Sequence, residues 1–337
     1  MEPLVSILIP TYNRRVFVQE AVASCLSQTY PHLEVIVLDD GSTDDTQAWG
    51  EALTDPRIHY AYKPHRGVDA LATMTNEMLE SAQGHYVALL DADDYYLDSL
   101  AIETLIAAIR ESGAAMVFGS LQPIDSTNQP LPVGGPFTLP HHQRLNCNAW
   151  SSAAFMKELL KSNFIPANAN LIDGSVLRSI GGFQAFPGFP AQDYHVWLAL
   201  ALSHRIHWVD HAITAWRIHG GQTTSSRGMD LATGAFRVSQ YYFAQAVDRG
   251  LLNPEDWPEI EKARKLAIAR TCWGQVQRHA PAHEWQAMRA MAKSQIVLGD
   301  RPLKVEGMIA YGASYLHVDL ITPLLTWAAR HQLRLNS

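Results

Sequence analysis

Two hydrophobic patterns alternate along residues 1–120. Short, nearly continuous apolar runs rich in Val and Ile predict buried strands at 4–10, 33–38, 58–62, 86–90 and 114–119. The stretches between these runs predict helices at Phe17–Ser27, Thr43–Leu53, Asp69–Ala82 and Ser99–Glu111. Apolar strands that alternate with helices are typical of a parallel sheet covered on both faces. The sequence therefore predicts an α/β fold with a mostly parallel, Rossmann-like sheet.

The pattern changes twice further along the chain. Residues 121–165 are rich in Pro, Gly and His and predict an excursion with little regular structure. A second strand-and-helix stretch follows and closes at "WRIHGGQTTSS". Beyond it, helical patterns predominate, at Ala235–Arg249, Glu259–Arg278, Ala282–Ile296 and about Tyr311–Leu333. We predict one α/β domain at 1–228 and a helical C-terminal region at 229–337.

The composition is ordinary for a globular protein. Of 337 residues, 47% are hydrophobic and 18% are charged. No stretch reaches the roughly 18 consecutive apolar residues of a membrane-spanning helix. The first apolar run follows an acidic residue, so we expect a strand there rather than a secretory signal. The three cysteines are widely scattered, which predicts no disulfide framework and favours a reducing cytoplasm.

Charge is distributed unevenly. Residues 1–230 hold 13 Lys and Arg against 24 Asp and Glu, whereas 231–337 hold 13 against 9. The acidic first part argues against nucleic acid as a partner and suits a protein that binds a divalent cation. The basic second part allows peripheral contact with the anionic inner face of a membrane, although its apolar helices are more often core. These helices also allow a homo-oligomer.

Polar residues gather where three predicted strands end. "PTYNR" follows the first strand, "DDGSTDDT" the second and "DADD" the fourth. Ligands bind outside the carboxyl ends of parallel strands, so this convergence favours a site over solvated turns or helix N-termini. The sequence has no G-x-G-x-x-G after the first strand and no G-x-x-x-x-G-K-[ST]. A nucleotide bound without such a cradle needs another neutraliser for its phosphates, and a metal ion on aspartates supplies one.

One aspartate of the second cluster is a candidate for contact with a nucleotide base. Asp39 ends the second strand, and a buried carboxylate facing a uracil-like imide N–H makes a strong charge-assisted bond. Tyr12 supplies a ring against the same base, with packing as the alternative. A purely structural role in favouring the following helix is equally compatible with Asp39.

Five segments together resemble family 2 glycosyltransferases of the GT-A fold. They are "PTYNR", "VLDDGSTDDT", "GHYVALLDADD", "IGGF" and "QDYHVWLALA", and they occur in the family's order and spacing. The resemblance covers about residues 4–225. It implies a GT-A type sheet and an inverting transfer from a nucleotide-diphospho-sugar.

The resemblance also implies binding roles. The residues that it places at the nucleotide are Pro10, Thr11, Tyr12, Asp39, Arg66, Asp91 and Ala92. Asp91 and Asp93 match the D-x-D motif, in which the first contacts the ribose and the last coordinates Mn²⁺ or Mg²⁺ on the diphosphate. His219 resembles a histidine that contacts the diphosphate or the metal, with a structural histidine as the alternative. The match around Arg66 is poor, since "MTN" stands where "ARN" is common.

Asp193 lies where the family keeps its catalytic base. Inversion at an anomeric carbon needs a carboxylate that takes the proton of the acceptor hydroxyl, while a metal stabilises the leaving diphosphate. The alternative is a helix N-terminal aspartate. Gln192 stands where many relatives carry a second acid.

These implications describe a metal-dependent inverting glycosyltransferase. We expect it to move a sugar from a UDP- or dTDP-sugar to a saccharide or glycolipid acceptor, in polysaccharide, lipopolysaccharide or glycoprotein synthesis. Two alternatives are a nucleotidyltransferase, which would release pyrophosphate, and a non-catalytic nucleotide- or sugar-binding subunit of a glycosyltransferase complex. The complete set of Asp39, Asp91, Asp93 and Asp193 favours the enzyme.

Overall fold

A computed structural model describes residues 2–132 and 147–279, with isolated helical residues between 286 and 308. Most of the predicted helix Ala282–Ile296 and the whole of 311–333 lie outside the described residues, and so does 133–146 of the predicted excursion.

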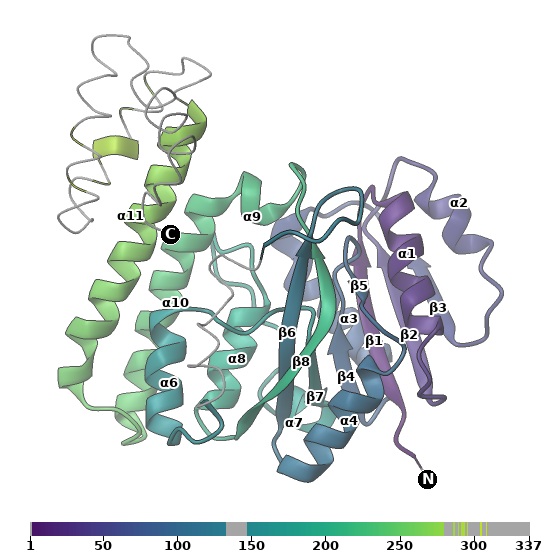
Figure 1. The fold of residues 1–337 in the computed structure, drawn as a ribbon, viewed down its shortest axis with the longest axis horizontal. Coiled ribbons are helices and arrows are strands. Elements are labelled where there is room, and N and C mark those ends of the chain that lie inside the picture. Colours follow the sequence, from purple (N-terminus) through teal and green to yellow (C-terminus); the bar gives the residue numbers. More distant parts are fainter. Residues whose placement is uncertain are drawn as a thin grey trace.

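The described residues form one eight-stranded sheet (Figure 1). Its strands are β1 (Val5–Thr11), β2 (Leu33–Asp39), β3 (Ile58–Tyr62), β4 (Tyr86–Leu89), β5 (Tyr95–Tyr96), β6 (Met116–Ile124), β7 (Asn170–Asp173) and β8 (Ile206–Arg217). The order is β3-β2-β1-β4-β7-β6-β8-β5. β3, β2, β1 and β4 are parallel, and β7 enters antiparallel between β4 and β6. The carboxyl ends of β1, β2 and β4 therefore share one edge.

Helices cover both faces of the sheet. They are α1 (Arg15–Leu26), α2 (Thr46–Glu51), α3 (Leu71–Ser81), α4 (Ala101–Ser112), α6 (Ser152–Lys161), α7 (Gly174–Ser179), α8 (Asp193–Ala201), α9 (Thr223–Ser226), α10 (Gly228–Asp248) and α11 (Trp257–His279), with 3₁₀ turns at Val68–Ala70 and Pro254–Asp256. α4 shows how sequence sets the packing: Ile102, Leu105 and Ile109 fall on one buried stripe. It ends at Gly113, whose φ of 61° favours glycine.

Two apolar clusters fill the space between sheet and helices. Alternate residues of β1 face opposite ways, so Ile7 and Ile9 join the cluster under α1 and α4, and Leu8 joins the other. That second cluster includes side chains of α3, α6, α8 and α10. β1 is buried on both faces, as its largely apolar sequence predicts.

The main differences from the predicted elements have local causes. The predicted helix Thr43–Leu53 begins three residues later, because side chains bind the backbone N–H groups of the preceding loop. Asp39 Oδ1 accepts from Ser42 N at 2.8 Å, and Asn13 Oδ1 accepts from Thr43 N at 2.7 Å. The long strand β8 was not predicted as a strand, because its polar positions break the apolar run.

The C-terminal helices pack on the α/β part rather than standing apart. α11 lies against α10 and α6, and α10 also contacts α8 (Figure 1). Val238, Tyr242 and Ile260 belong to the same apolar cluster as the sheet. The boundary at 228/229 as a division between domains stays a prediction. In the part of the chain that the structure describes, no helix has both the length and the apolar character to cross a membrane.

Candidate active site

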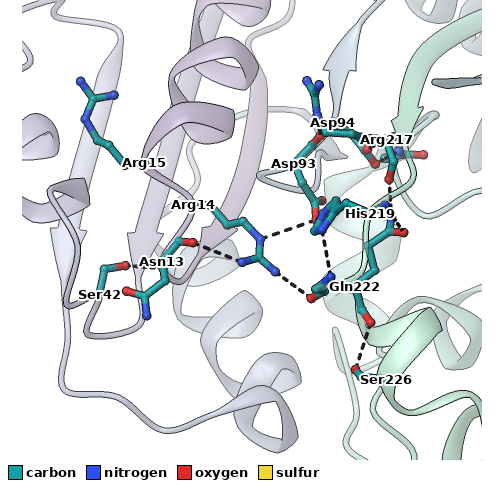
Figure 2. A network of polar contacts seen from close by, with 12 residues as sticks. Asn13, Arg14, Arg15, Ser42, Asp93, Asp94, Arg217, His219, Gln222 and Ser226 are labelled. Carbon is teal, nitrogen blue, oxygen red and sulfur yellow. Dashed lines mark hydrogen bonds and ion pairs between the residues drawn. The ribbon is translucent and has the colours of Figure 1, made fainter. Parts of the chain in front are cut away.

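The carboxyl ends of β1, β2 and β4 carry the three predicted polar clusters. The backbone of Asp40 donates to Thr11 O at 2.9 Å, which joins the first two loops. The backbone N–H of Asn13 donates to Ser42 Oγ at 2.8 Å, as Figure 2 shows. The sheet thus brings together segments that lie some thirty residues apart in sequence.

On the β2 side, the aspartates are bound by the protein itself. Asp39 is fully buried, and its carboxylate accepts from Ser42 N at 2.8 Å and from the Tyr60 hydroxyl at 2.7 Å. Burial, and then the hydrogen bond to Asp39, raise the pKa of Tyr60. These contacts give Asp39 a structural role in holding Ser42 and Tyr60, which differs from the helix-dipole role that we weighed.

Asp40 has a role that the sequence did not indicate. Its carboxylate accepts from the backbone N–H groups of Arg66 and Gly67, each at 2.9 Å, and lies 2.9 Å from His65 Nδ1. The His65 ring stacks on Tyr12, with ring centres 4.0 Å apart. Asp40 thus holds loop 65–67 against the Tyr12 ring. The only sequence signal was the second Asp of "DD".

Several predicted nucleotide residues lie around this loop. Tyr12 is half-exposed, Thr11 is buried next to it, and Pro10 pairs with β2 inside the sheet. The Arg66 guanidinium forms an ion pair with Glu77 at 2.5 Å and lies 3.7 Å from Asp40. In this structure the Arg66 side chain therefore has carboxylate partners within the protein.

The aspartates of the turn after β4 have different environments. Asp94 is buried, and its carboxylate accepts from Arg217 N at 2.8 Å and from the Asn168 amide. Burial, and then the neighbouring charges of Asp93 and Asp91, raise the pKa of Asp94. These bonds indicate that Asp94 supports the turn. Ala92, also buried, lies between the two aspartates of the D-x-D motif.

Asp93 lies opposite two side chains from other segments of the chain, those of His219 and Arg14 (Figure 2). His219 Nε2 lies 2.9 Å from Asp93 Oδ2, and Arg14 Nε lies 3.8 Å from the same oxygen. The backbone N–H of Gly221 donates to His219 Nδ1 at 3.2 Å, which places the ring proton on Nε2, toward Asp93. Arg14 also donates to Gly221 O at 2.8 Å. We did not predict a role for Arg14, although it stands in "PTYNR" directly after β1.

Arg217, at the end of β8, binds the backbone of the D-x-D turn. Its Nε donates to Asp93 O at 2.8 Å, and its Nη2 pairs with Glu20 at 2.5 Å. The guanidinium lies 4.5 Å from the centre of the Phe17 ring, an arrangement that stabilises a cation. Arg217 is fully buried, and it ties β8 and α1 to the D-x-D turn.

The predicted base lies close to this turn. Asp193 is buried at the N-terminus of α8, and its Oδ2 accepts from the Asn163 amide at 3.2 Å. Burial raises the pKa of Asp193. Burial, and then the charges of Asp93 and Asp193, raise the pKa of Asp91 to about 7. The fold has thus brought Asp193 near the D-x-D motif, about a hundred residues away in sequence.

The family assignment rests on a match to the model described as "Glycosyl transferase family 2", over residues 6–159. This segment holds the first two polar clusters and the whole D-x-D turn. Residues 6–159 are a family 2 glycosyltransferase domain. The predicted family and its GT-A type fold are confirmed.

Individual relatives and solved structures agree with this family assignment. The chain is 27% identical, over 60% of its length and 72% of the relative's, to the Escherichia coli UDP-Glc:alpha-D-GlcNAc-diphosphoundecaprenol beta-1,3-glucosyltransferase WfgD. It resembles S. aureus TarS 1–349 in complex with UDP-GlcNAc, with a TM-score of 0.56 and 16% identity over 99% of this chain and 93% of that one. The mannosyltransferase PcManGT from Pyrobaculum calidifontis, in complex with GDP-Man and Mn²⁺, gives the same TM-score at 20% identity, covering 99% and 85%. At such identities the two structures show the fold alone.

Coverage of the relatives is partial. The matches span 37% of the length of a Bacillus subtilis relative, and 67% and 35% of two Rickettsia glycosyltransferases. The family assignment is therefore a statement about the transferase domain.

The side chains present fit a divalent cation with few protein ligands. Mg²⁺ and similar ions are commonly held by one or two carboxylates together with substrate phosphates. Asp93 offers such a carboxylate, and its neighbours Asp91 and Asp94 add negative charge. Within the described residues, no three His, Cys, Asp or Glu side chains form a complete metal cluster. His219 would bind a metal through Nε2 only in its other tautomer, which gives up the bond from Gly221.

Proposed function

We propose that this chain is an inverting glycosyltransferase that uses a nucleotide-diphospho-sugar and a divalent cation. The observation that carries the proposal is the convergence of Asp91, Asp93 and Asp193 at one edge of the sheet, where burial, and then the charges of the other two, raise the pKa of Asp91. Two carboxylates with distinct tasks, one at the diphosphate and one at the acceptor, are what an inverting transfer requires.

The donor site is formed by the ends of β1, β2 and β4. We assign the base to Tyr12 and Asp39, the ribose to Asp91, and the diphosphate to Asp93 and His219. Asp93 would hold Mn²⁺ or Mg²⁺, which when bound neutralises the charge of the leaving diphosphate. Arg14, next to Asp93, is a cation within reach of the same phosphates. The carboxylate Asp39 favours UDP- or dTDP-sugars.

The acceptor side is formed by Asp193 and its neighbours. The Asp193 carboxylate takes the proton of the acceptor hydroxyl while that oxygen attacks the anomeric carbon and the bond to the diphosphate breaks. Asn163 Oδ1 and Gln192 Oε1 are buried and have no hydrogen-bond partner in the described structure. Such atoms are costly unless a ligand satisfies them, so they support an acceptor rich in hydroxyls. The named activity of WfgD supports a saccharide-lipid acceptor in cell-surface polysaccharide assembly.

A thermal-shift panel tests the donor half of the proposal. UDP-, dTDP- and GDP-sugars are each added with Mn²⁺ and with EDTA. A donor at about 100 times its Kd adds roughly 2.7 kcal/mol, which raises the melting temperature by several degrees. We expect a shift that needs both a uracil or thymine nucleotide and the metal. No shift with any donor would argue instead for a subunit that acts within a complex.

A further inference from the structure

A buried cation, that of Arg264, contacts Tyr194, the residue that follows Asp193 in α8. No role has yet been assigned to the residues around it. Arg264, on α11, is only 4% exposed. Its Nε donates to Leu160 O at 2.6 Å and its Nη2 to Leu159 O at 3.3 Å. Nη2 also contacts the Tyr194 hydroxyl, and the guanidinium lies 4.9 Å from the centre of that ring. In the described part of the chain, the groups that hold this charge are therefore neutral.

A buried charge without a counter-ion is costly, and the end of a helix offsets that cost here. Leu159 and Leu160 lie in the last turn of α6, where carbonyls lack intrahelical partners and carry the negative end of the helix dipole. The Tyr194 hydroxyl donates to Leu159 O at 2.8 Å and lies 3.0 Å from Ser239 Oγ of α10. Arg264 is thus the centre of a polar junction between α6, α8, α10 and α11.

Both segments that Arg264 binds lead directly to Asp193. Tyr194 is the next residue of α8. Asn163, whose amide donates to Asp193, follows the end of α6. The relative placement of these two segments sets where the Asp193 carboxyl points and which hydrogen bond it accepts.

We propose that Arg264 is a positioning residue, which clamps the end of α6 to the start of α8 and so fixes the Asp193 carboxyl for catalysis. The C-terminal helix α11 is then a working part of the transferase and not only its support. This inference rests on the proposed function, in which Asp193 is the base. The charged and titratable groups that face Asp193 in the described residues are Asp91 from the end of β4 and Tyr194, with Arg264 behind it.

The experiment compares Arg264→Gln and Arg264→Lys with a matched control. Arg178, exposed on α7, donates to the carbonyls of Leu79 and Ala82 at the end of α3, so Arg178→Gln removes arginine-to-carbonyl bonds between another pair of helices at the surface. The readout is the titration of the Asp193 carboxyl followed by ¹³C NMR in the full chain without donor, with the signal assigned by its loss in Asp193→Asn.

We expect Arg264→Gln to raise the Asp193 titration midpoint by about half a pH unit, because the bond from Asn163, which lowers the pKa of Asp193, weakens once α6 and α8 are no longer held together. Arg264→Lys should restore most of that shift, and Arg178→Gln should leave the midpoint unchanged. With an active donor and acceptor, kcat of Arg264→Gln should fall about tenfold while the donor KM stays within about twofold.

A wild-type midpoint in folded Arg264→Gln, even with lowered stability, overturns the proposal and leaves Arg264 a purely structural residue. Should Arg264→Gln fail to fold, Tyr194→Phe removes just the hydroxyl that links Arg264 to α8, and an unchanged midpoint there overturns it equally. Absence of transfer by the wild type would count against the proposed function alone, because the titration needs no turnover.

Discussion

Aspartates follow β2 and β4, the two strands that flank β1 in the sheet, yet the protein treats them differently. At β2, the carboxylates of Asp39 and Asp40 are buried and accept hydrogen bonds from backbone N–H groups and the Tyr60 hydroxyl. At β4, Asp91 is partly buried beside other carboxylates, and loss of solvent and then their charges raise its pKa to about 7. Position in the fold is similar, so the difference lies in the partners.

That difference in partners separates carboxylates that stabilise the fold from carboxylates that serve the reaction. A buried carboxylate with its hydrogen bonds made stabilises the loop that supplies them. A buried carboxylate that faces like charge is destabilising until a cation or a proton arrives, and such groups gather at functional sites. We therefore expect substitution of Asp40 to cost stability, and substitutions of Asp93 and Asp193 to cost function.

The largest effect should come from Asp193→Asn. Loss of the general base should lower kcat about 1,000-fold, within the usual range for such catalysis, while donor binding persists. Transfer rates and donor-induced thermal shifts measure the two properties separately. Asp98→Asn, a half-exposed aspartate that pairs with His211, is the control. Transfer at the wild-type rate by Asp193→Asn would show that another group takes the proton.

Asp93→Asn should abolish the dependence of donor binding on Mn²⁺ or Mg²⁺, and His219→Ala should weaken it about tenfold. Calorimetric titration of the donor with and without metal measures both. Asp93→Asn should lose little folding stability, because relief from the neighbouring carboxylate Asp91 offsets the weaker bond to His219. Full metal dependence in Asp93→Asn would place the cation on other ligands.

Asp40→Asn should lower folding stability more than it lowers function. One carboxylate oxygen is replaced by an NH2 donor, so one of the two backbone N–H groups, of Arg66 or Gly67, loses its acceptor and the other keeps only a neutral one. We expect a loss of about 2 kcal/mol in the free energy of unfolding, with a smaller effect on transfer. Urea unfolding measures the first quantity. A variant as stable as the wild type would erase the distinction between the two strand ends.

The smallest effect concerns stability and pH. Burial raises the pKa of Asp193, so its contribution to stability is fully present below the ordinary carboxyl pKa and is lost as pH rises through the raised value. Asparagine carries no charge, so Asp193→Asn should melt higher than the wild type at pH 8, on the order of 1 kcal/mol or a few degrees. This difference in melting temperature should disappear as the pH falls. A gap that does not depend on pH would mean that Asp193 is not ionised in the folded protein.

Local pattern predicted much of the fold and the outline of the site. Continuous apolar runs separated by helical spacing gave the four parallel strands and their covering helices, since burial on two faces leaves that signature. Asp39, Asp91, Asp93, Asp193 and His219 were singled out by their place after strands or by motif. The start of α2 and the strand β8 were not predicted, because side chains from distant loops and neighbouring strands decide them.

The sequence alone determined which residue types stand at the strand ends, because secondary-structure period and strand-end position are properties of neighbouring residues. Tertiary structure alone decided what each one contacts. Asp40 holds the loop before α3, Arg217 of β8 holds the turn of Asp93, and Arg264 of α11 contacts Tyr194 of α8. These pairs lie between 27 and 124 residues apart, a separation at which no periodic pattern specifies a partner. Hydrogen bonds between residues that are distant in sequence therefore decide which aspartates support the structure and which are placed for the reaction.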